Sequence, residues 1–590
     1  MDGRARPVYN EEKNTAEDAM NRSFEWFNQA RFGLMLHWGL YTQLAGEYRG
    51  RRMDYIGEWI QSRFEIPNEE YSRLTRAMNP IGFSAEGWVK LAKAAGMEYI
   101  VLTSKHHEGF AMYRSEADPF NIVDATPFGR DPIAELAEAC QKHNMRLGLY
   151  YSQELDWHEP DGGGYTRGHT NHGMSWTNDW DFPDNDKKDF SRCFERKIKP
   201  QVKELLTKYG DLALIWFDTP GVITPEQSRE LYDMVKAYQP HCLVNSRIGN
   251  GLGDYFSLGD NQVPAGAGAK GRLYETAATL NDTWGYKAFD QNWKTADQTI
   301  SLLTRLASRN TNYLLNVGPD PLGRIPAAAQ DILRAVGDWM QAGGRDAVHG
   351  CEASPFPMDL SSGPVTKKGN KLYFFLNSPV PGGSFKVNGI EGQAARSYLT
   401  RQKRPLVQVQ HPMRGLDGLT RLGVMLPSDV RKNDVLCVEF LDDVRVPGMA
   451  VEQPDGRVEL KATAAEWMGD VQVGPGGAAE NWKDERAMAG WRFAVVRDGE
   501  FEISLRVSGH YITSPQLGQE LVLGLDGEEI SLTLSGGEKD ASLENRYYTA
   551  SDARLCRASL SEGEHELSLR LAGEAAEALR LQSVRLVRCE

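Results

Sequence analysis

Three features are scarce or missing in this 590-residue chain, and each absence removes a class of proteins. The seven cysteines are scattered, odd in number and never paired as CxxC, so we expect neither a disulfide framework nor a zinc knuckle. No run of about 18 apolar residues occurs, so we predict no membrane-spanning helix. Lys and Arg number 67 against 81 Asp and Glu, and a net charge of −14 disfavours nucleic acid partners and anionic lipid surfaces.

The start of the sequence and its composition bear on where the chain works. The segment MDGRARPVYNEEKNTAEDAM carries charges where a secretory signal needs an apolar run. Because the cysteines also form no disulfide pattern, we expect a cytoplasmic location. Hydrophobic residues make up 41% of the chain and charged residues 25%, which allows a globular core without metals or disulfides. The sequence leaves homo-oligomerisation open.

Residues 1–345 alternate short apolar runs with longer amphipathic stretches such as Ala85–Ala95 and Ile133–His143. Nearly continuous apolar runs are typical of parallel strands buried on both faces. They are predicted at Phe32–Leu36, Tyr99–Leu102, Leu147–Tyr151, Leu212–Phe217, Cys242–Val244 and Tyr313–Val317. Strand followed by helix, repeated over about 300 residues, predicts a (β/α)8-like TIM barrel. An open doubly wound sheet is the alternative.

The polar residues that end the apolar runs favour the barrel. In a barrel the carboxyl ends of all strands converge on one mouth, whereas an open sheet brings only those at its switch point together. Six polar strand ends are difficult to explain unless they share a site. They are His37, Lys105-His106-His107, Tyr150-Tyr151-Ser152, Asp218, Asn245-Ser246-Arg247 and Asn316.

The sequence pattern of the remainder of the chain is typical of β structure. Residues 346–448 contain short alternating segments, KLYFFLNS and DVLCVEFLDD among them, separated by Gly, Pro, Asn or Asp. Residues 449–590 contain a second set, in which EHELSLRLAG alternates cleanly. We therefore predict a barrel at 1–345, a β-sandwich at 346–448 and a second β-sandwich at 449–590.

Carboxylates at the predicted mouth point to hydrolysis of a glycosidic bond. Asp218, in LALIWFDTP, follows an apolar run and is the candidate nucleophile or base. Glycoside hydrolysis needs a second carboxyl group that protonates the leaving oxygen. Glu275, in LYETAATLNDTWGY, follows a stretch rich in Gly and Ala and is the first candidate for it. Glu58 and Glu108 are further candidates.

Other strand-end groups are those that bind sugars. His37, His106, His107 and Glu58 can bond hydroxyl groups, Trp38, Trp59, Trp157 and Trp284 offer flat apolar faces, and Arg247 could bond a sugar oxygen or hold Asp218. A metal site is the competing interpretation of the three histidines. Neither HExxH nor a paired HxH is present, and adjacent strand residues point to opposite faces. We expect no metal and no other cofactor.

Eight segments in order make this sequence resemble glycoside hydrolase family 29, the α-L-fucosidases. They are RFGLMLHWGLYT, GEWI, TSKHHEGFAMYRS, RLGLYYSQELDWH, LIWFDTP, VNSR, YETAATLNDTWGY and NYLLNVGPDPLG. The resemblance covers roughly residues 20–345. It implies a (β/α)8-like barrel followed by a β-sandwich, and hydrolysis of terminal α-L-fucosyl residues with retention through a glycosyl-enzyme intermediate. A fucosylated oligosaccharide or glycoconjugate is then the expected substrate.

The resemblance also implies roles for individual residues. Asp218 corresponds to the nucleophile and Glu275 to the acid/base. The fucose hydroxyls would be bound by His37, Glu58, Trp59, His106 and His107, and the same pocket would be lined by Tyr150, Arg247 and Trp284. The sequence alone leaves open whether Glu275 or Glu58 is the acid/base.

Some positions depart from the usual family wording, and several alternatives stay open. Thr219 stands where WFDG would have a glycine, which bears on substrate choice more than on chemistry. A related exo-glycosidase such as an α-L-galactosidase is one alternative, a fucoside-binding protein without activity another, and a metallohydrolase a third. The last block resembles galactose-binding-like or carbohydrate-binding β-sandwiches, and it would either bind glycan or serve only in packing.

Overall fold

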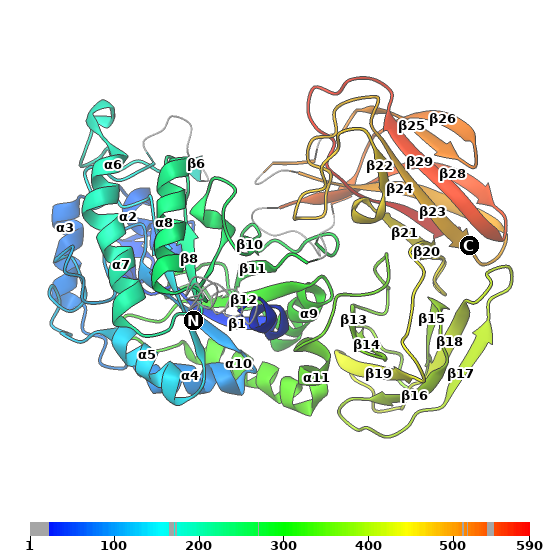
Figure 1. Cartoon of the computed structure of the whole chain (residues 1–590), viewed down its shortest axis with the longest axis horizontal. Coiled ribbons are helices and arrows are strands. Elements are labelled where there is room, and N and C mark those ends of the chain that lie inside the picture. Colours follow the sequence, from blue (N-terminus) through cyan, green and yellow to red (C-terminus); the bar gives the residue numbers. More distant parts are fainter. Residues whose placement is uncertain are drawn as a thin grey trace, which may run out of the picture. The chain divides into compact units, whose positions relative to one another are not determined.

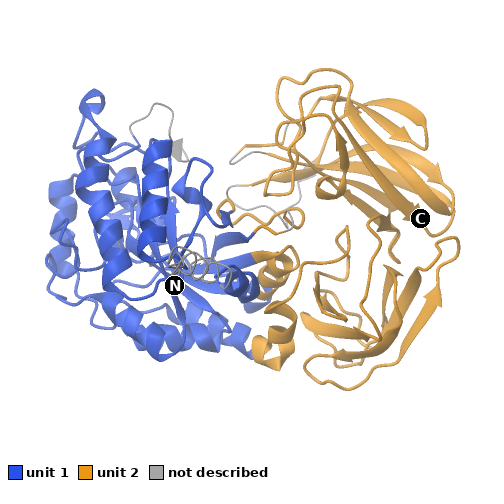
Figure 2. Cartoon of the chain, viewed as in Figure 1, with its two compact units in different colours: residues 1–257, 273–299, 312–338 blue, residues 258–272, 300–311, 339–590 orange. Residues whose placement is uncertain are grey.

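The computed structural model describes residues 23–164, 170–171, 174–268, 271–509, 513–515, 517–539 and 548–589 (Figure 1). The chain divides into two compact units (Figure 2), one of residues 1–257, 273–299 and 312–338 and one of residues 258–272, 300–311 and 339–590. The two units are defined by how compactly the chain packs. The domain boundaries at 345 and 448 are placed from the kind of secondary structure in the sequence, and they stay predictions. No helix among the described residues is long and apolar enough to cross a membrane.

The first unit is built around one eight-stranded sheet with the order β10-β11-β12-β1-β4-β5-β8-β9. An additional parallel bridge between Asn245 and Tyr255 joins the β9 and β10 ends, which closes the sheet into the predicted barrel. The strands are β1 Phe32–Leu36, β4 Tyr99–Lys105, β5 Arg146–Ser152, β8 Leu214–Asp218, β9 Leu243–Val244, β10 Phe256–Ser257, β11 Tyr274–Thr279 and β12 Thr311–Val317. Small pairs outside the barrel are β2 Glu47–Tyr48 with β3 Arg51–Arg52 and β6 Thr170–Asn171 with β7 Met174–Ser175.

Local signals in the sequence explain where the main helices begin. Ser84 and Asp131 accept hydrogen bonds from backbone N–H groups of the first turn that follows each. Thr224 forms a reciprocal capping box with Gln227. The longer helices are α4 Ala85–Ala94, α5 Pro132–Lys142, α7 Lys199–Lys208, α8 Pro225–Tyr238, α9 Ala296–Ala307 and α10 Ala327–Trp339; the short ones are α2 Ile60–Arg63, α3 Asn68–Ser72, α6 Phe190–Cys193 and α11 Arg345–Val348.

The second unit contains two pairs of sheets, as the alternating sequence predicts, and their strands pair antiparallel except for β20 with β23, which is parallel. The first pair has the orders β13-β14-β19-β16 and β15-β18-β17, with strands β13 Val365–Lys368, β14 Lys371–Leu376, β15 Ser384–Ile390, β16 Ala394–Leu399, β17 Gln408–Pro412, β18 Thr420–Met425 and β19 Asp434–Phe440. The inward residues of both sheets form one apolar cluster that includes Phe374, Leu422 and Leu436.

The second pair of sheets has the orders β20-β23-β29-β25-β26, with β22 beside β23, and β21-β30-β24-β28-β27. Its core includes Trp482, Phe493 and Leu586. The strands are β20 Ala450–Val451, β21 Arg457–Lys461, β22 Glu466–Met468, β23 Met488–Val495, β24 Gly499–Ser508, β25 Glu520–Leu525, β26 Glu528–Thr533, β27 Glu538–Lys539, β28 Ala550–Leu560, β29 Gly563–Leu571 and β30 Leu581–Arg588.

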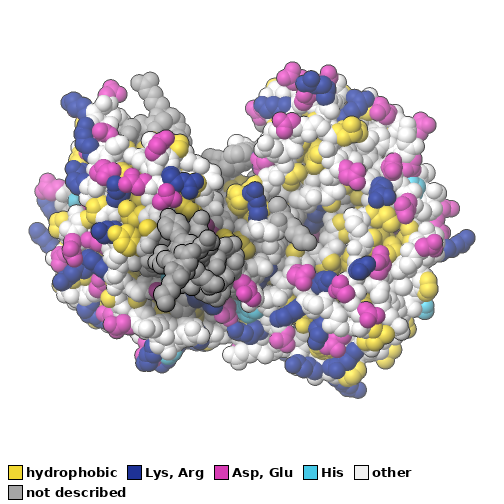
Figure 3. Space-filling model, in the orientation of Figure 1, with side chains coloured by type: hydrophobic (Ala, Val, Ile, Leu, Met, Phe, Trp, Pro, Cys, Tyr) yellow, Lys and Arg dark blue, Asp and Glu magenta, His cyan; other side chains and the backbone are white. Residues whose placement is uncertain are grey.

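Charged side chains lie on the surface and also in the interior of the barrel unit. On the face shown in Figure 3, acidic and basic side chains are interspersed, so this face does not carry charge of one sign alone. Inside the barrel unit, Asp156 is buried and pairs with Lys105 at 3.0 Å and with Lys197 at 2.7 Å. Lys197 also pairs with Asp118 at 2.6 Å. Although burial alone would raise the pKa of Asp156, the two lysines lower it, so the group is charged at neutral pH.

Replacing Asp156 by Ala should destabilise the protein strongly. The change leaves two buried lysines without their shared partner, and breaking a buried pair typically costs about 3–5 kcal/mol. Chemical denaturation followed by circular dichroism measures the loss. Asp331→Ala is the control, because Asp331 pairs with Arg334 on the surface and should cost under about 1 kcal/mol. Equal losses in the two variants would contradict a structural role for the buried cluster.

Candidate active site

Asp218 is the last residue of β8, and two side chains from neighbouring elements hold its carboxylate. Tyr150 on β5 donates its hydroxyl to Oδ2 at 2.8 Å, and Arg247 donates Nη1 to Oδ1 at 3.1 Å. Arg247 follows β9 in a short 3-10 turn, Ser246–Ile248. The Asp218 side chain keeps 15% of its surface exposed. An oriented and accessible carboxyl group therefore lies at the carboxyl end of a barrel strand, where barrel active sites lie.

Stacked rings hold the two donors in place. The Tyr150 ring stacks on Trp216 with centroids 5.5 Å apart. The Arg247 guanidinium lies over the same tryptophan, 4.6 Å from the ring centroid. Because Trp216 lies two residues before Asp218 on one strand, both side chains face the barrel interior, and Trp216 forms the floor beneath the carboxylate.

His37, His106 and His107 form a buried cluster beside Tyr150. The His106 and His107 rings are 3.9 Å apart, and His37 and His106 each lie 5.4 Å from Tyr150. One ring nitrogen of His37 bonds Asn316 at 2.7 Å, and one of His107 bonds Ser152 Oγ at 2.7 Å. Burial, together with the neighbouring histidines and Lys105, holds the pKa of His106 and of His107 well below the usual range.

His106 and His107 are therefore neutral at pH 7. A neutral imidazole both donates and accepts hydrogen bonds, which is how a sugar hydroxyl is bound. Within the described residues, no group of three or more His, Cys, Asp or Glu side chains could hold a metal ion.

Trp59, Trp284 and Glu58 border the same cluster. Trp284 lies 5.1 Å from His37, and Trp59 lies 5.3 Å from His107. Glu58 is buried and accepts the backbone N–H of Gly285 at 2.7 Å, which ties it to the segment that carries Trp284. The structure thus brings the predicted sugar-binding residues together around the Asp218 carboxylate.

Glu275 lies deeper than the other predicted residues. It is on β11, has no exposed surface, and its two carboxyl oxygens accept from Tyr99 Oη at 2.7 Å and Trp216 Nε1 at 2.8 Å. Burial raises its pKa to about 7. Since Trp216 is the floor beneath Asp218, Glu275 contacts the layer of the barrel below the nucleophile. Its role as acid/base stays a prediction.

Glu108, the fourth carboxylate considered from sequence, is a structural anchor. It is fully buried and accepts the backbone N–H groups of Leu40 and Tyr41 at 2.8 and 3.1 Å, together with the Tyr71 hydroxyl. Those contacts fix the segment that follows β1 and His37. Burial raises the pKa of Glu108 to about 8.

The structure gives a backbone reason for the sequence departure at Thr219. Its φ is +58°, a left-handed conformation that is an outlier for a β-branched residue. This agrees with the glycine that the resemblance leads us to expect there.

The sequence did not single out Gln153 and Glu154, which come directly after β5. Gln153 Nε2 donates to the Arg247 carbonyl in the turn after β9, and Glu154 accepts the Ile223 N–H in the loop that follows Asp218. The only feature of the sequence that could have indicated these two residues is their position after an apolar run.

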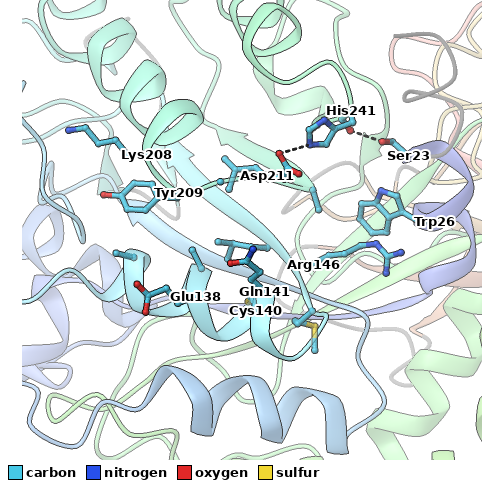
Figure 4. A pocket seen from close by; sticks show the side chains of 17 residues that line it. Ser23, Trp26, Glu138, Cys140, Gln141, Arg146, Lys208, Tyr209, Asp211 and His241 are labelled. Atoms are coloured by element: carbon cyan, nitrogen blue, oxygen red, sulfur yellow. Dashed lines mark hydrogen bonds and ion pairs between the residues drawn. The ribbon is translucent and has the colours of Figure 1, made fainter. Parts of the chain in front are cut away.

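A separate cavity of about 730 Å³ lies at the amino-terminal ends of β5, β8 and β9 (Figure 4). Figure 4 shows Trp26, Tyr209 and His241 around it, with Asp211 paired to His241 at 3.9 Å. Catalytic residues of barrels come from the opposite, carboxyl ends of the strands. The chemistry therefore belongs to the Asp218 side of the sheet.

A closed parallel barrel with a carboxylate, neutral histidines and tryptophans at its mouth defines a carbohydrate-hydrolase type of site. The α-L-fucosidase family profile matches residues 4–345, so the chain belongs to the α-L-fucosidase family.

Individual relatives agree with this membership. The tissue α-L-fucosidase of Bos taurus is 28% identical over 377 residues, which is 60% of this chain and 74% of the bovine one. The α-L-fucosidase of Vibrio sp. strain EJY3 superposes with a TM-score of 0.82 at 28% identity and covers 96% of this chain and 98% of its own. AlfC of Lactobacillus casei, solved with its α-L-fucose product, is 52% identical with a TM-score of 0.53 and covers 55% of this chain and all of its own.

The buried Glu108 should make stability depend on pH. Its pKa is about 8 when folded and ordinarily 4.5. Between these values the folded state keeps a proton that the unfolded state has lost. The stabilisation is therefore complete below pH 4.5 and is lost as pH rises through 8. Urea denaturation measures the free energy of unfolding of the wild type and of Glu108→Gln. The difference in favour of the wild type should shrink by up to about 4 kcal/mol from pH 5 to 8.5. A constant or growing advantage would argue against a protonated Glu108; the exposed Glu195→Gln is the control.

Proposed function

We propose that this protein is a retaining exo-α-L-fucosidase that releases terminal α-L-fucosyl residues through a covalent glycosyl-enzyme intermediate. The observation that carries the proposal is the Asp218 carboxylate, held by Tyr150 and Arg247 at the barrel mouth within a chain of the α-L-fucosidase family. Retention requires a carboxylate that attacks C1, with a second carboxyl group for the leaving oxygen.

The proposed first step is attack of Asp218 on C1 of the fucosyl residue. Arg247 and Tyr150 each take one carboxylate oxygen, which orients the group and leaves lone pairs for attack. As the bond to the leaving oxygen breaks, positive charge develops on the sugar ring, and the nearby carboxylate stabilises it. Water then attacks C1 of the intermediate and gives up a proton to the group that protonated the leaving oxygen; the bond from C1 to Asp218 breaks, and fucose is the product.

The proposed substrate contacts follow from the groups around the carboxylate. The imidazoles of His37, His106 and His107 would bond the sugar hydroxyls, and the Trp59 and Trp284 faces would cover the C–H side of the ring. AlfC has been solved with Fucα(1,6)GlcNAc as well as with fucose, and its similarity to this barrel supports a fucosylated oligosaccharide as the substrate.

The proton donor is proposed to be Glu275 or Glu58. Glu275 has a pKa raised to about 7 by burial, so the protonated form that an acid needs is well populated near neutral pH. Against this, both of its oxygens are engaged by Tyr99 and Trp216. Glu58 lies among the sugar-binding residues but has one oxygen bonded to the Gly285 N–H.

Asp218→Gly should remove the nucleophile while leaving the fold intact. Turnover of 4-nitrophenyl-α-L-fucoside should fall by about 10³-fold or more, as is usual for a nucleophile. Azide should restore part of the rate by entering the vacated space and attacking C1. The measurements are the rate of nitrophenol release and the anomeric configuration of the fucosyl azide that forms. Unchanged activity of the variant would show that Asp218 is not the nucleophile. If the wild-type enzyme hydrolyses another L-glycoside and not the fucoside, the proposed mechanism stands but the proposed substrate is wrong.

Substrates with different leaving groups identify the acid. The true acid variant should lose about 10²-fold or more on Fucα(1,6)GlcNAc and under 10-fold on the 4-nitrophenyl fucoside, whose leaving group needs no proton. Glu275→Gln and Glu58→Gln are compared directly by kcat/KM on the two substrates. Asp260→Asn is a third arm, because this half-buried carboxylate follows β10 by three residues. If a substitution lowers kcat/KM equally on both substrates, the substituted residue is not the acid and has a structural role instead.

A further inference from the structure

Gln153, the residue after β5, contacts the backbone of both members of the Asp218–Arg247 pair. Its N–H donates to the Asp218 carbonyl at 3.3 Å. Its side-chain Nε2 donates to the Arg247 carbonyl at 2.8 Å and lies 3.4 Å from the Ile248 carbonyl. Gln153 has no exposed surface. One residue therefore links the two elements: its backbone N–H contacts the strand end that carries the carboxylate, and its side chain contacts the turn that carries the cation.

The next residue, Glu154, holds the loop that follows Asp218. Its Oε2 accepts the backbone N–H groups of Val222 and of Ile223, the latter at 3.2 Å. The side chain is fully buried, and an added Cβ at Gly163 would overlap it. A buried carboxyl group is costly unless it is hydrogen-bonded, and the two backbone N–H groups supply hydrogen bonds to one of its oxygens, Oε2.

The loop held by these residues contains strained backbone. Thr219, next to the proposed nucleophile, has φ +58°, and its Oγ1 donates to the Asp218 carbonyl at 2.8 Å. The Leu155 N–H lies 3.4 Å from the same Oγ1. Strained conformations of this kind persist only where surrounding contacts over-determine them, and they concentrate at functional sites.

We propose that Gln153 and Glu154 are positioning residues that hold the Asp218–Arg247 pair and the strained loop in the geometry needed for attack on C1. The inference rests on the proposed function of Asp218. A nucleophile must be placed within about 0.5 Å of its productive position, so loosening its backbone lowers kcat more than it weakens substrate binding.

Matched residues elsewhere in the barrel unit provide the controls. Gln239 is a buried glutamine whose Nε2 donates to the backbone carbonyls of Leu206 and Gly210, away from the strand ends that carry the site. Glu204 is a buried glutamate whose Oε1 accepts the backbone N–H groups of Glu116 and Ala117. Each loses the same kind of contact when replaced by Ala.

The experiment measures kcat, KM and Tm for the four alanine variants on 4-nitrophenyl-α-L-fucoside. Gln153→Ala and Glu154→Ala should lower kcat by about 10-fold or more with KM within about 3-fold, because positioning affects the transition state. Gln239→Ala and Glu204→Ala should lower Tm comparably and keep kcat within about 2-fold. Equal kcat losses in test and control variants, or wild-type kcat in both test variants, would overturn the proposal.

A conservative variant separates positioning from bulk packing. Because one oxygen of Glu154 takes both N–H groups, the carbonyl of Gln can replace it, so Glu154→Gln should recover most of the kcat lost in Glu154→Ala. Recovery of Tm without kcat would contradict the proposal. If Glu154→Ala does not fold, Gln153→Ala and its Gln239→Ala control carry the test.

Combination with Asp218→Gly distinguishes this proposal from the function on which it rests. With azide as the nucleophile, the position of residue 218 no longer matters, so adding Gln153→Ala should cost under about 2-fold. A full additional loss in that background would overturn the positioning role. Absence of any loss or rescue in Asp218→Gly itself would instead reject the proposed nucleophile.

Discussion

The Asp218 carboxylate is held by a phenol from β5 and a guanidinium from the turn after β9, and the rest of the barrel mouth is arranged around this contact. The contact depends on the strand order, because β8 lies between β5 and β9 and the parallel register sets Ser152 beside Asp218. Trp216 then supports both donors from below through one stacked ring and one cation–π contact. A shift of one residue in the register of β8 would turn both Trp216 and Asp218 away from the interior.

Burial sets the ionisation of the groups around the carboxylate. It lowers the pKa of His106 and His107 and raises those of Glu275 and Glu108, which favours the uncharged form of each of these side chains. Neutral groups cost less to bury than ions, and His107, Glu275 and Glu108 each also bond a specific partner. The result is an accessible carboxyl group that is held by one cation and surrounded by neutral donors and acceptors, which are the groups that a sugar with several hydroxyls requires.

Sequence alone predicted the barrel because six strands are uninterrupted apolar runs ending in polar residues, and all six are present. It missed β10 and β11 because the former is two residues long and YETAAT contains small and polar residues that face a crowded interior. The sequence also could not show how deeply each carboxylate is buried. Asp218 and Glu275 both follow or occupy strands, yet only the packing of Tyr99 and Trp216 against Glu275 shows that it lies a layer deeper.

Trapping the intermediate tests the proposed nucleophile most directly. The enzyme is incubated with a 2-deoxy-2-fluoro-α-L-fucosyl donor bearing a good leaving group, digested, and its peptides are analysed by mass spectrometry. One 2-fluorofucosyl group should be added, and Asp218 should carry it. A label on another carboxylate, or β-fucose as the first product by NMR with no label at all, would contradict the proposed nucleophile.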